Sequence, residues 1–457
     1  MKGIYRISIL FFIPLLIFGQ SNSKLLKLDD AISIALNRNS NLIKSTNNIL
    51  MYEKSVKNAY GELLPTLGVN GSFNWSNTSD EGGMQVDFWG NEYLVPPTNS
   101  DARNWSLGVG GNVVLFNGLS NYNNITKNKK DLESAEFSIQ KLKQDIVLET
   151  TRLYLDVLYN QELLKVSKDN LEYNKKFLET VEAKNQLGSA SIADVYAQQV
   201  RLGNAELSVI QTEKDYEVAI SNLLDYLALN VLDKYEFQNP YVNKEVQNPI
   251  IEEIVRKIES DSSYVNQLID EALENRPDYK SQILNVESKN YGMSISKSAL
   301  FPTLTGNYYY STSATQLSSL FNRRVFSLGL SLNIPIFSNW STEYSMQVSE
   351  IQLKNSQEDL NILERQIKME LKKGYLDYIT AKKKFDVSNK NVISAEENRK
   401  VNNERYNLGS GTILDILQSD KDYTEAISNK LSAQFEYYLY KEAIVYYLGR
   451  LDISKYE

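Results

Sequence analysis

The residues of this 457-residue chain that could perform chemistry are carboxylates, because the chain contains neither cysteine nor histidine. Without cysteine there is no thiolate nucleophile, disulfide or Cys-ligated metal centre. Without histidine there is no Ser–His–Asp triad and no His-ligated zinc or haem, and the side chain best suited to proton transfer near neutral pH is missing. What remains is acid–base work by paired carboxylates, or binding of Mg or Ca through oxygen ligands.

Two adjacent carboxylate pairs, Asp80-Glu81 and Glu252-Glu253, are the candidates for a carboxylate-based hydrolase. Such a reaction needs two acids that face each other across one cleft. Neighbours in sequence do not meet this requirement, and both pairs are typical of solvated loops or of the first turn of a helix. We therefore predict no enzyme activity, no cofactor and no metal site.

The composition is that of a folded protein, with 42% hydrophobic and 23% charged residues. Its net charge of −8 argues against a nucleic-acid partner, since phosphate binding needs clustered Lys and Arg.

The first twenty residues predict export. Lys2 and Arg6 precede an apolar run over 9–18, and Gly19-Gln20 follows it. This is the pattern of a signal peptide over 1–20 that is cleaved near Gly19 or Gln20. No later segment has the roughly 20 consecutive apolar residues of a membrane helix. Two alternatives remain, a soluble exported protein and one that enters a membrane as β-structure.

The chain contains a long tandem repeat. Residues 64–67 (LPTL) align with 301–304 (FPTL) at a displacement of 237. From Ser106 to Asp194 the displacement stays at 221, so that Tyr154-Leu155-Asp156 aligns with Tyr375-Leu376-Asp377. We predict two structural repeats with the same order of elements.

Proline placement and heptads define those elements. Residues 98–239 and 336–457 contain no proline. A heptad seam with one stutter runs through Leu132, Ile139, Ile146, Leu153, Val157, Leu164, Leu171 and Leu178. We predict a very long helix over about 122–186, a tight turn, and a shorter helix over 192–229. The next repeat opens with a helix over about 265–299.

The predicted division of the chain follows from these elements. It consists of a signal peptide over 1–20, a first repeat over 21–234, an inter-repeat segment over 235–264 and a second repeat over 265–457. In the first repeat the strands fall at about 67–76 and 104–115, and the turn at 187–193. In the second they fall at about 303–312 and 325–336, and the turn at 408–414.

The predicted strands alternate between apolar and small polar residues, with aromatic side chains toward their ends. This pattern fits membrane strands with an aromatic girdle of Trp75, Trp105, Tyr308 and Tyr310. The alternative is a soluble sheet that packs on a helix. Four strands cannot close a barrel and open edges are not tolerated in lipid, so several chains must share one barrel. Two chains would give eight strands, and three would give twelve and a lumen.

Signal peptide, repeats, strand pairs and long helices together resemble the TolC-like outer-membrane channel family. The matching motifs are LPTL and FPTL, VLFNG at 114–118 with PIFSN at 335–339, and LGSASIADV at 187–195 with LGSGTILDI at 408–416. The resemblance implies a mixed, mainly α fold and a homotrimer. Four strands per chain would form a shared twelve-stranded transmembrane β-barrel, and long antiparallel helices an α-barrel in the Gram-negative periplasm.

The resemblance also implies partners and sites. The partners are outer-membrane lipid, a periplasmic adaptor (membrane fusion) protein, and an inner-membrane pump or ABC transporter. The adaptor would contact the tip turns at Leu187, Gly188, Ser189, Leu408, Gly409 and Ser410. An acidic ring of the periplasmic gate falls on Asp415, while the family's second acidic position is Gln418. A latch tyrosine matches Tyr406, but Gly411 replaces its arginine partner.

A plain alternative exists for the predicted gate. Asp415 is also placed to be an N-terminal helix carboxylate favoured by the helix dipole, and Asp194 suits that role equally well in the other half.

The leading functional hypothesis is a passive exit duct of a tripartite efflux or type I secretion system. The alternative is an exported helical adhesin or stalk without a pore. The sequence does not name the cargo.

Overall fold

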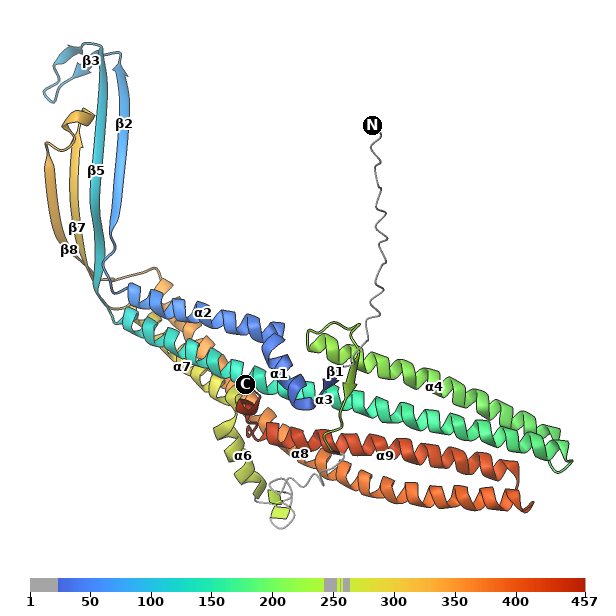
Figure 1. Ribbon diagram of the computed structural model, residues 1–457. Coiled ribbons are helices and arrows are strands. Elements are labelled where there is room, and N and C mark those ends of the chain that lie inside the picture. The colour runs from blue at the N-terminus through green and yellow to red at the C-terminus, as the bar shows by residue number, and fades with distance from the viewer. Residues whose placement is uncertain (1–23, 242–252, 255, 258–263, 457) are drawn as a thin grey trace, which may run out of the picture.

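The structure is a computed structural model that describes residues 24–241, 253–254, 256–257 and 264–456. The predicted signal peptide and part of the predicted inter-repeat segment lie outside the described residues. The molecule is elongated, with a β-sheet at one end and two helix–helix turns at the other (Figure 1).

Two helices of 67 residues, α3 (Ser120–Gln186) and α8 (Ser341–Asn407), run along the molecule. At 1.5 Å per residue each is about 100 Å long. The helices α4 (Ile192–Tyr226) and α9 (Ile413–Tyr447), of 35 residues each, return antiparallel along the half far from the sheet. In the other half, α2 (Ser40–Gly61) and α7 (Pro277–Ser298) lie beside α3.

None of the described helices combines the length and the hydropathy that crossing a membrane requires.

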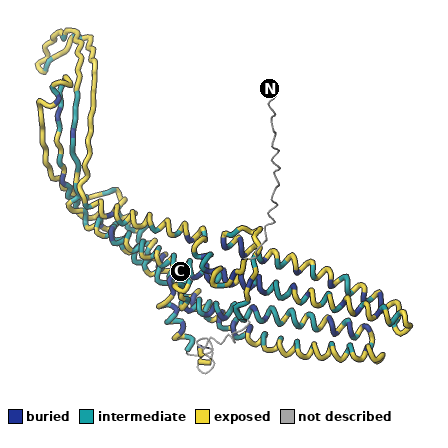
Figure 2. Tube along the Cα trace, viewed as in Figure 1, coloured by how far each residue is buried: buried dark blue, intermediate teal, exposed yellow. Residues whose placement is uncertain are grey.

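The heptad seam of the sequence faces the interior of the helical part. Ile146, Leu153, Val157 and Leu164 are all buried in α3. Figure 2 shows buried residues along the facing sides of the helices and exposed residues on their outer sides. The apolar stripe of α3 is therefore buried by packing against other helices of the same chain.

One helix of the sequence-based prediction is interrupted. The stretch predicted as a single helix over about 265–299 is α6 (Tyr264–Asn275) followed by α7, with extended backbone at Arg276 between them. Pro277 explains the break, because it has no N–H to donate and forces the preceding residue out of the helical conformation. In the first half α1 (Leu28–Arg38) is likewise separated from α2 at Asn39, whose side chain caps α2.

The middle of the molecule, which we call the waist, is the level at which α7 begins and α9 ends. Gly449, just after α9, lies against the backbone of Arg276. The Arg276 guanidinium is buried and pairs with Asp278 at 2.6 Å and with Glu370 at 2.8 Å. The pair with Glu370 holds the start of α7 onto α8, while the pair with Asp278 lies within the first turn of α7.

A second group of contacts at the waist is aromatic. The parallel strands β1 (Lys24–Leu26) and β6 (Tyr235–Phe237) lie on α3, where the Tyr154 hydroxyl donates to the Leu26 carbonyl oxygen at 2.8 Å. Phe237 and Tyr438 belong to the largest buried cluster, and the Tyr438 ring stacks on Tyr241 with centroids 4.2 Å apart. The tyrosine-rich segment of α9 is thus core at this level.

The sheet has the order β2 (Gly68–Asp80), β5 (Thr98–Asn117), β7 (Thr303–Ala314) and β8 (Arg324–Asn333), with every neighbouring pair antiparallel. Because β5 pairs with β7, the sheet joins the two halves of the chain. β2 and β8 are its edge strands.

β2 and β5 extend past their predicted ends at about 76 and 104, over residues 77–80 and 98–103. This extension is polar, and it pairs through side chains such as Asn77 and Asp101, whose atoms Nδ2 and Oδ1 lie 2.8 Å apart. A small hairpin of β3 (Gly83–Val86) and β4 (Glu92–Val95) completes the far end. Apolar alternation, on which the strand prediction relied, is absent from the extension.

The register gives the sheet one apolar and one polar face. Val109 lies opposite Val69 and Tyr310, and Tyr310 lies opposite Phe326. On the other face Ser106 lies opposite both Ser72 and Ser313. The apolar face is uncovered in this chain, where Leu328 and Leu330 of β8 are 78% and 73% exposed. Figure 2 shows this exposure along both edge strands.

Gly110 marks a close approach within the sheet. A Cβ built there would lie 2.4 Å from Cδ2 of Tyr309 and 2.6 Å from the carbonyl oxygen of Tyr308. Tyr309 can lie flat on the polar face of β5 only because glycine leaves this space.

We expect Gly110→Ala to lower the free energy of unfolding by about 1–3 kcal/mol, because the new methyl group would clash with backbone as well as side chain. Gly329→Ala is the matched control, since a Cβ at Gly329 on β8 meets nothing within 4 Å. It should change stability by less than about 0.5 kcal/mol. The measurement is urea unfolding of the detergent-extracted protein, and equal effects of the two changes would contradict the assignment.

Candidate functional site at the helical tip

The two tip turns, between α3 and α4 and between α8 and α9, have the same backbone. Gly188 and Gly409 adopt φ of 73° and 74°, a conformation that glycine enters without steric cost. The N–H groups of Ser189 and Ser410 donate to carbonyl oxygens of Lys184 and Arg405, both at 2.8 Å. Each long helix therefore ends on a glycine C-cap.

The tip turns present apolar side chains to solvent. Leu187 and Leu408 are 83% and 84% exposed, and a Cβ at either adjacent glycine would meet nothing within 4 Å. The hydroxyls of Ser189 and Ser410 instead bond back to the helix ends, at 3.0 and 3.1 Å. The sequence-predicted docking residues thus form two small protrusions whose outer atoms are leucine methyl groups.

Asp194 and Asp415 occupy the same position in the first turns of α4 and α9. The Asp415 carboxylate accepts the Thr412 N–H at 3.0 Å, and Thr412 Oγ1 accepts the Asp415 N–H at 3.2 Å. Asp194 and Ser191 make the same pair of bonds at 2.9 and 3.1 Å. Both aspartates are therefore members of capping boxes, as the plain alternative for these residues required.

The cap also fixes the charge of Asp415. Its hydrogen bonds from the Thr412 backbone N–H and hydroxyl lower the pKa of the carboxyl, so the group is ionised at neutral pH. Gln418 does not bond to Asp415; its Nε2 donates to Asp422 at 2.7 Å. Asp415 and Gln418 both line a shallow groove between α4 and α9.

Tyr406 lies between the two helix hairpins. Its ring contacts Phe177 with centroids 5.6 Å apart, and Lys184 Nζ sits 4.1 Å from the ring centroid. The same ammonium donates to the Tyr406 carbonyl oxygen at 3.2 Å. Burial raises the pKa of Tyr406, with the Asp194 charge adding to the effect. Lys184, from the other hairpin, is therefore the cation that contacts Tyr406.

A buried charge cluster, which the sequence analysis missed, joins all four helices above the tip. Asp420 on α9 is 1% exposed and pairs with Arg399 of α8 at 2.9 Å and with Arg201 of α4 at 3.3 Å. Asn174 of α3 donates to the same carboxylate at 3.3 Å. We call these four residues the Asp420 cluster.

Aromatic rings enclose this cluster. The Arg399 guanidinium lies 3.6 Å from the ring centroid of Tyr173 and 4.7 Å from that of Tyr423. Such stacking adds attraction while keeping water away from the charges. Asp420 falls one turn after Ile416, which is buried, and therefore lies on the inward side of α9. From the sequence, the spacing of four residues between Asp420 and an apolar residue was the available clue. Its partners come from helices far apart in the chain.

The predicted girdle residues all lie on the apolar face of the sheet, but at several heights. Trp75 pairs with Arg103 toward the far end, and Trp105 contacts Phe73 with ring centroids 4.3 Å apart. Tyr310 lies mid-sheet beside Val109, and the Tyr308 hydroxyl donates to the Thr66 carbonyl oxygen. At the helix side, two further aromatic residues that were not predicted for the girdle, Phe337 and Trp340, contact each other and are exposed.

The fold is that of channel-forming outer-membrane proteins. The solved structure of CusC, described in connection with transmembrane channel formation, superposes with a TM-score of 0.79 over 93% of each chain, at 15% sequence identity.

The family assignment comes from the sequence comparisons. The chain matches the family model for outer membrane efflux proteins over residues 31–229 and 268–450 and belongs to this family. It is similar to the outer membrane efflux protein BepC of Brucella suis, with 18% identity over 362 residues, 77% of this chain and 73% of BepC. It is also similar to the outer membrane protein TolC of Vibrio cholerae, with 20% identity over 397 residues, 84% and 82% of the two chains.

Membership of this TolC-type family settles the location and the general activity. The protein is an outer-membrane efflux protein whose helical part lies in the periplasm, and the members of the family are channels rather than enzymes.

We expect Asp420→Asn to destabilise the tip half by about 3 kcal/mol, because it leaves two arginines without their shared counter-charge in a largely dry site. Asp422→Asn, one half-turn away on the exposed side of α9, is the matched control and should cost less than about 0.5 kcal/mol. Urea unfolding and limited proteolysis of the extracted protein would measure both. If the two variants behaved alike, the cluster would not hold the hairpins together.

Proposed function

We propose that three copies of the chain form one passive exit duct of a tripartite efflux or type I secretion system. The observation that carries this proposal is that both lateral edges of the molecule, in the helices as well as in the sheet, have surfaces suited to another copy. The alternative of a helical stalk offers no role for an uncovered apolar sheet face.

An apolar stripe follows the outer side of α8. Its exposed members are Tyr344, Ile351, Ile362, Met369, Leu376, Val387 and Val401. Because each residue turns a helix by about 100°, steps of 7, 11 and 14 residues keep these side chains on one face. Ile367 and Tyr378, which are buried within the chain, lie on the opposite face.

A similar stripe follows α4, on the other edge of the helical layer. Its exposed members are Ile192, Tyr196, Val200, Leu207, Ile210 and Val218. They lie opposite the buried Gln198 and Ala205, and Gln198 Nε2 donates to the Asn174 carbonyl oxygen of α3 at 3.0 Å. Exposed apolar stripes of this length on two edges are typical of a subunit interface. We propose that α8 of one copy packs against α4 of the next.

The sheet has matching edges. β2 and β8 each leave one row of backbone N–H and C=O groups unpaired, which lipid does not tolerate. Pairing of β8 of one copy with β2 of the next would satisfy both rows. Three copies would give twelve strands with a lumen, and the face carrying Ser72, Ser106 and Ser313 would line it. The apolar face would contact lipid.

We also propose that the chain consists of the two repeats predicted above, over 21–234 and 265–457. Equal lengths of α3 and α8, of α4 and α9, and of α2 and α7 support this division.

At the tip, we propose that the leucines of the two turns dock a periplasmic adaptor, which connects the duct to an inner-membrane pump or ABC transporter. The exposure of Leu187 and Leu408 on rigid glycine-capped turns supports this role. The gate would use the ionised Asp415, together with Gln418, Asp194 and Tyr406. The girdle of Trp75, Trp105, Tyr308 and Tyr310 would face lipid.

The assembly is tested by extraction from outer membranes followed by chemical crosslinking. We expect a three-subunit species that withstands SDS until it is heated, because strand pairing between copies would have to break before dissociation. A protein that remains soluble and monomeric without detergent would refute the proposal.

The gate is tested by conductance in planar bilayers. Asp415→Asn keeps an acceptor for the Thr412 N–H but removes the charge, so it should raise single-channel conductance and weaken divalent-cation block severalfold. Gln418→Glu should act in the opposite direction. Asp194→Asn removes the same type of cap; if it raised conductance as much as Asp415→Asn, loosening of the helix start rather than pore charge would explain the effect.

A further inference from the structure

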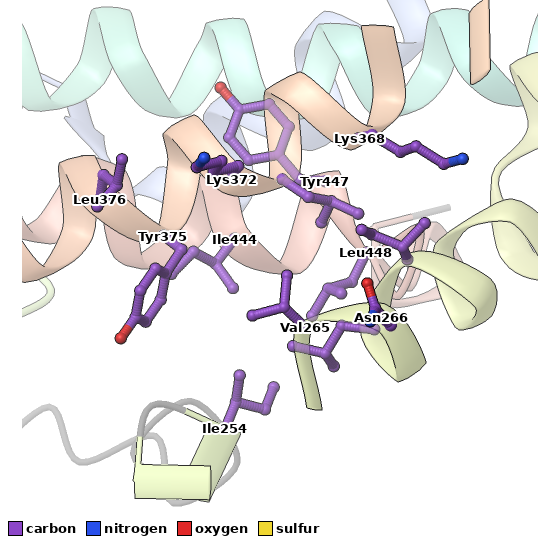
Figure 3. Close-up of a pocket in the computed structure, with 13 residues that line it drawn as sticks. Ile254, Val265, Asn266, Lys368, Lys372, Tyr375, Leu376, Ile444, Tyr447 and Leu448 are labelled. Atoms are coloured by element: carbon purple, nitrogen blue, oxygen red, sulfur yellow. The ribbon is translucent and has the colours of Figure 1, made fainter. Parts of the chain in front are cut away.

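A cavity of about 640 Å³ opens at the waist where α6, α8 and α9 meet. Val265 of α6, Tyr375 of α8 and Ile444 of α9 gather around it (Figure 3). Its lining is mainly apolar, and two lysines of α8, Lys368 and Lys372, also contribute. Lys368 pairs with Glu364, whereas Lys372 has no salt bridge to any described residue.

An apolar protrusion lies at the opposite edge of the molecule. The turn that follows α4 exposes Val231 and, to 84%, Leu232. Asn230 Oδ1 accepts the Leu232 N–H at 3.1 Å, and the Asn230 amide donates to Asp233 at 3.2 Å. These bonds fix the turn, so Leu232 is held outward rather than free to fold back. Figure 1 shows this turn on the side of the helices away from α6.

The protrusion and the cavity lie at the same distance from the tip. α4 and α9 both begin at the tip turns and both contain 35 residues, which is about 52 Å of helix. The tips themselves are adjacent, because Lys184 of one contacts Tyr406 of the other. The protrusion follows the end of α4, and Ile444 and Leu448 at the end of α9 line the cavity.

The cavity is also continuous with the interface proposed above. Leu376 belongs both to the exposed stripe of α8 and to the lining of the cavity. In a ring in which α8 of one copy meets α4 of the next, equal height brings the protrusion of one copy to the cavity of its neighbour. The charges at the two sites are complementary. The acidic Asp233 follows Leu232 in the chain, and the basic Lys372 lies one helical turn before Leu376.

We propose that the Val231-Leu232 turn of each copy inserts into the waist cavity of the next copy, with Asp233 facing Lys372. This inference rests on the proposed trimer and adds to it a specific contact outside the membrane. Three such contacts would form a closed belt of head-to-tail insertions around the waist, which is the arrangement that cyclic symmetry permits.

The absence of cysteine makes a direct test possible, because engineered pairs meet no competing thiol. Leu232→Cys combined with Leu376→Cys should form disulfides between chains upon oxidation of intact outer membranes, giving covalent trimers. The control combines Leu232→Cys with Ile351→Cys, a member of the same stripe about 38 Å nearer the sheet. It should give no covalent trimer, since a disulfide needs Cα atoms within about 7 Å.

The outcomes separate the two proposals. Trimers that form without the 232–376 link, or that link equally through 351, would overturn the insertion while leaving the trimer intact. A monomer in detergent would overturn both.

A second pair of variants measures what the contact contributes. Leu232→Asp should lower the temperature at which the SDS-resistant trimer dissociates by several degrees, because a charge would enter an apolar cavity. Leu187→Asp changes an equally exposed leucine at the tip and should leave this temperature unchanged. Equal shifts, or none at Leu232→Asp, would overturn the insertion.

Discussion

The constraint on which the rest of the structure depends is that a strand edge cannot face lipid. A four-stranded sheet with one apolar face has two open edges, β2 and β8, and the energetic penalty for unpaired backbone groups in hydrocarbon is several kcal/mol each. In the proposed assembly, strands of neighbouring copies would remove this penalty by pairing around a ring. Because β5 and α3 are separated by only two residues, the helices must follow the same arrangement. The exposed stripes on α8 and α4 fit that demand.

The helical part resolves a different problem, which is to hold two long hairpins together far from the membrane. Near the waist apolar and aromatic packing does so, as with Tyr154 and Tyr438. Toward the tip an apolar cluster that includes Phe177, Tyr406 and Ile416 continues this packing, and the Asp420 cluster and Lys184 add polar contacts between the hairpins. A buried charge cluster stabilises a fold less than apolar packing of the same volume. Removing one of its charges is nevertheless strongly destabilising, because the remaining buried charges lose their partner, and the pairs form in only one geometry. Such contacts would suit the proposed gate, which has to hold one arrangement and also change to another.

Much of the helical fold could be predicted from sequence, because helix signals are local. Proline-free length and the heptads of α3 placed a helix over about 122–186, and α3 spans Ser120–Gln186. Three features were missed. The break at Arg276 has a local signal, Pro277, which the helical pattern on both sides of it outweighed in the prediction. The far ends of β2 and β5 lack apolar alternation, and pair through polar side chains. The Asp420 cluster needs four helices brought together, which no local pattern records.

Local structure is also insufficient to assign a role to the acidic residues of the candidate site. Asp194 and Asp415 make equivalent capping boxes, so local structure alone does not distinguish a gate from a helix cap. The two aspartates differ in their neighbours. Asp415 shares a groove with Gln418, whereas Asp194 lies beside Lys184 and Tyr406. An ionised aspartate at the start of a helix is favoured by the helix dipole, and here it also places a negative charge at the end of the molecule. In the proposed threefold ring that charge would be repeated around one axis, where closely spaced negative charges would bind a divalent cation that blocks permeation. The same residue can therefore begin a helix in each chain and act on permeation only in the assembly.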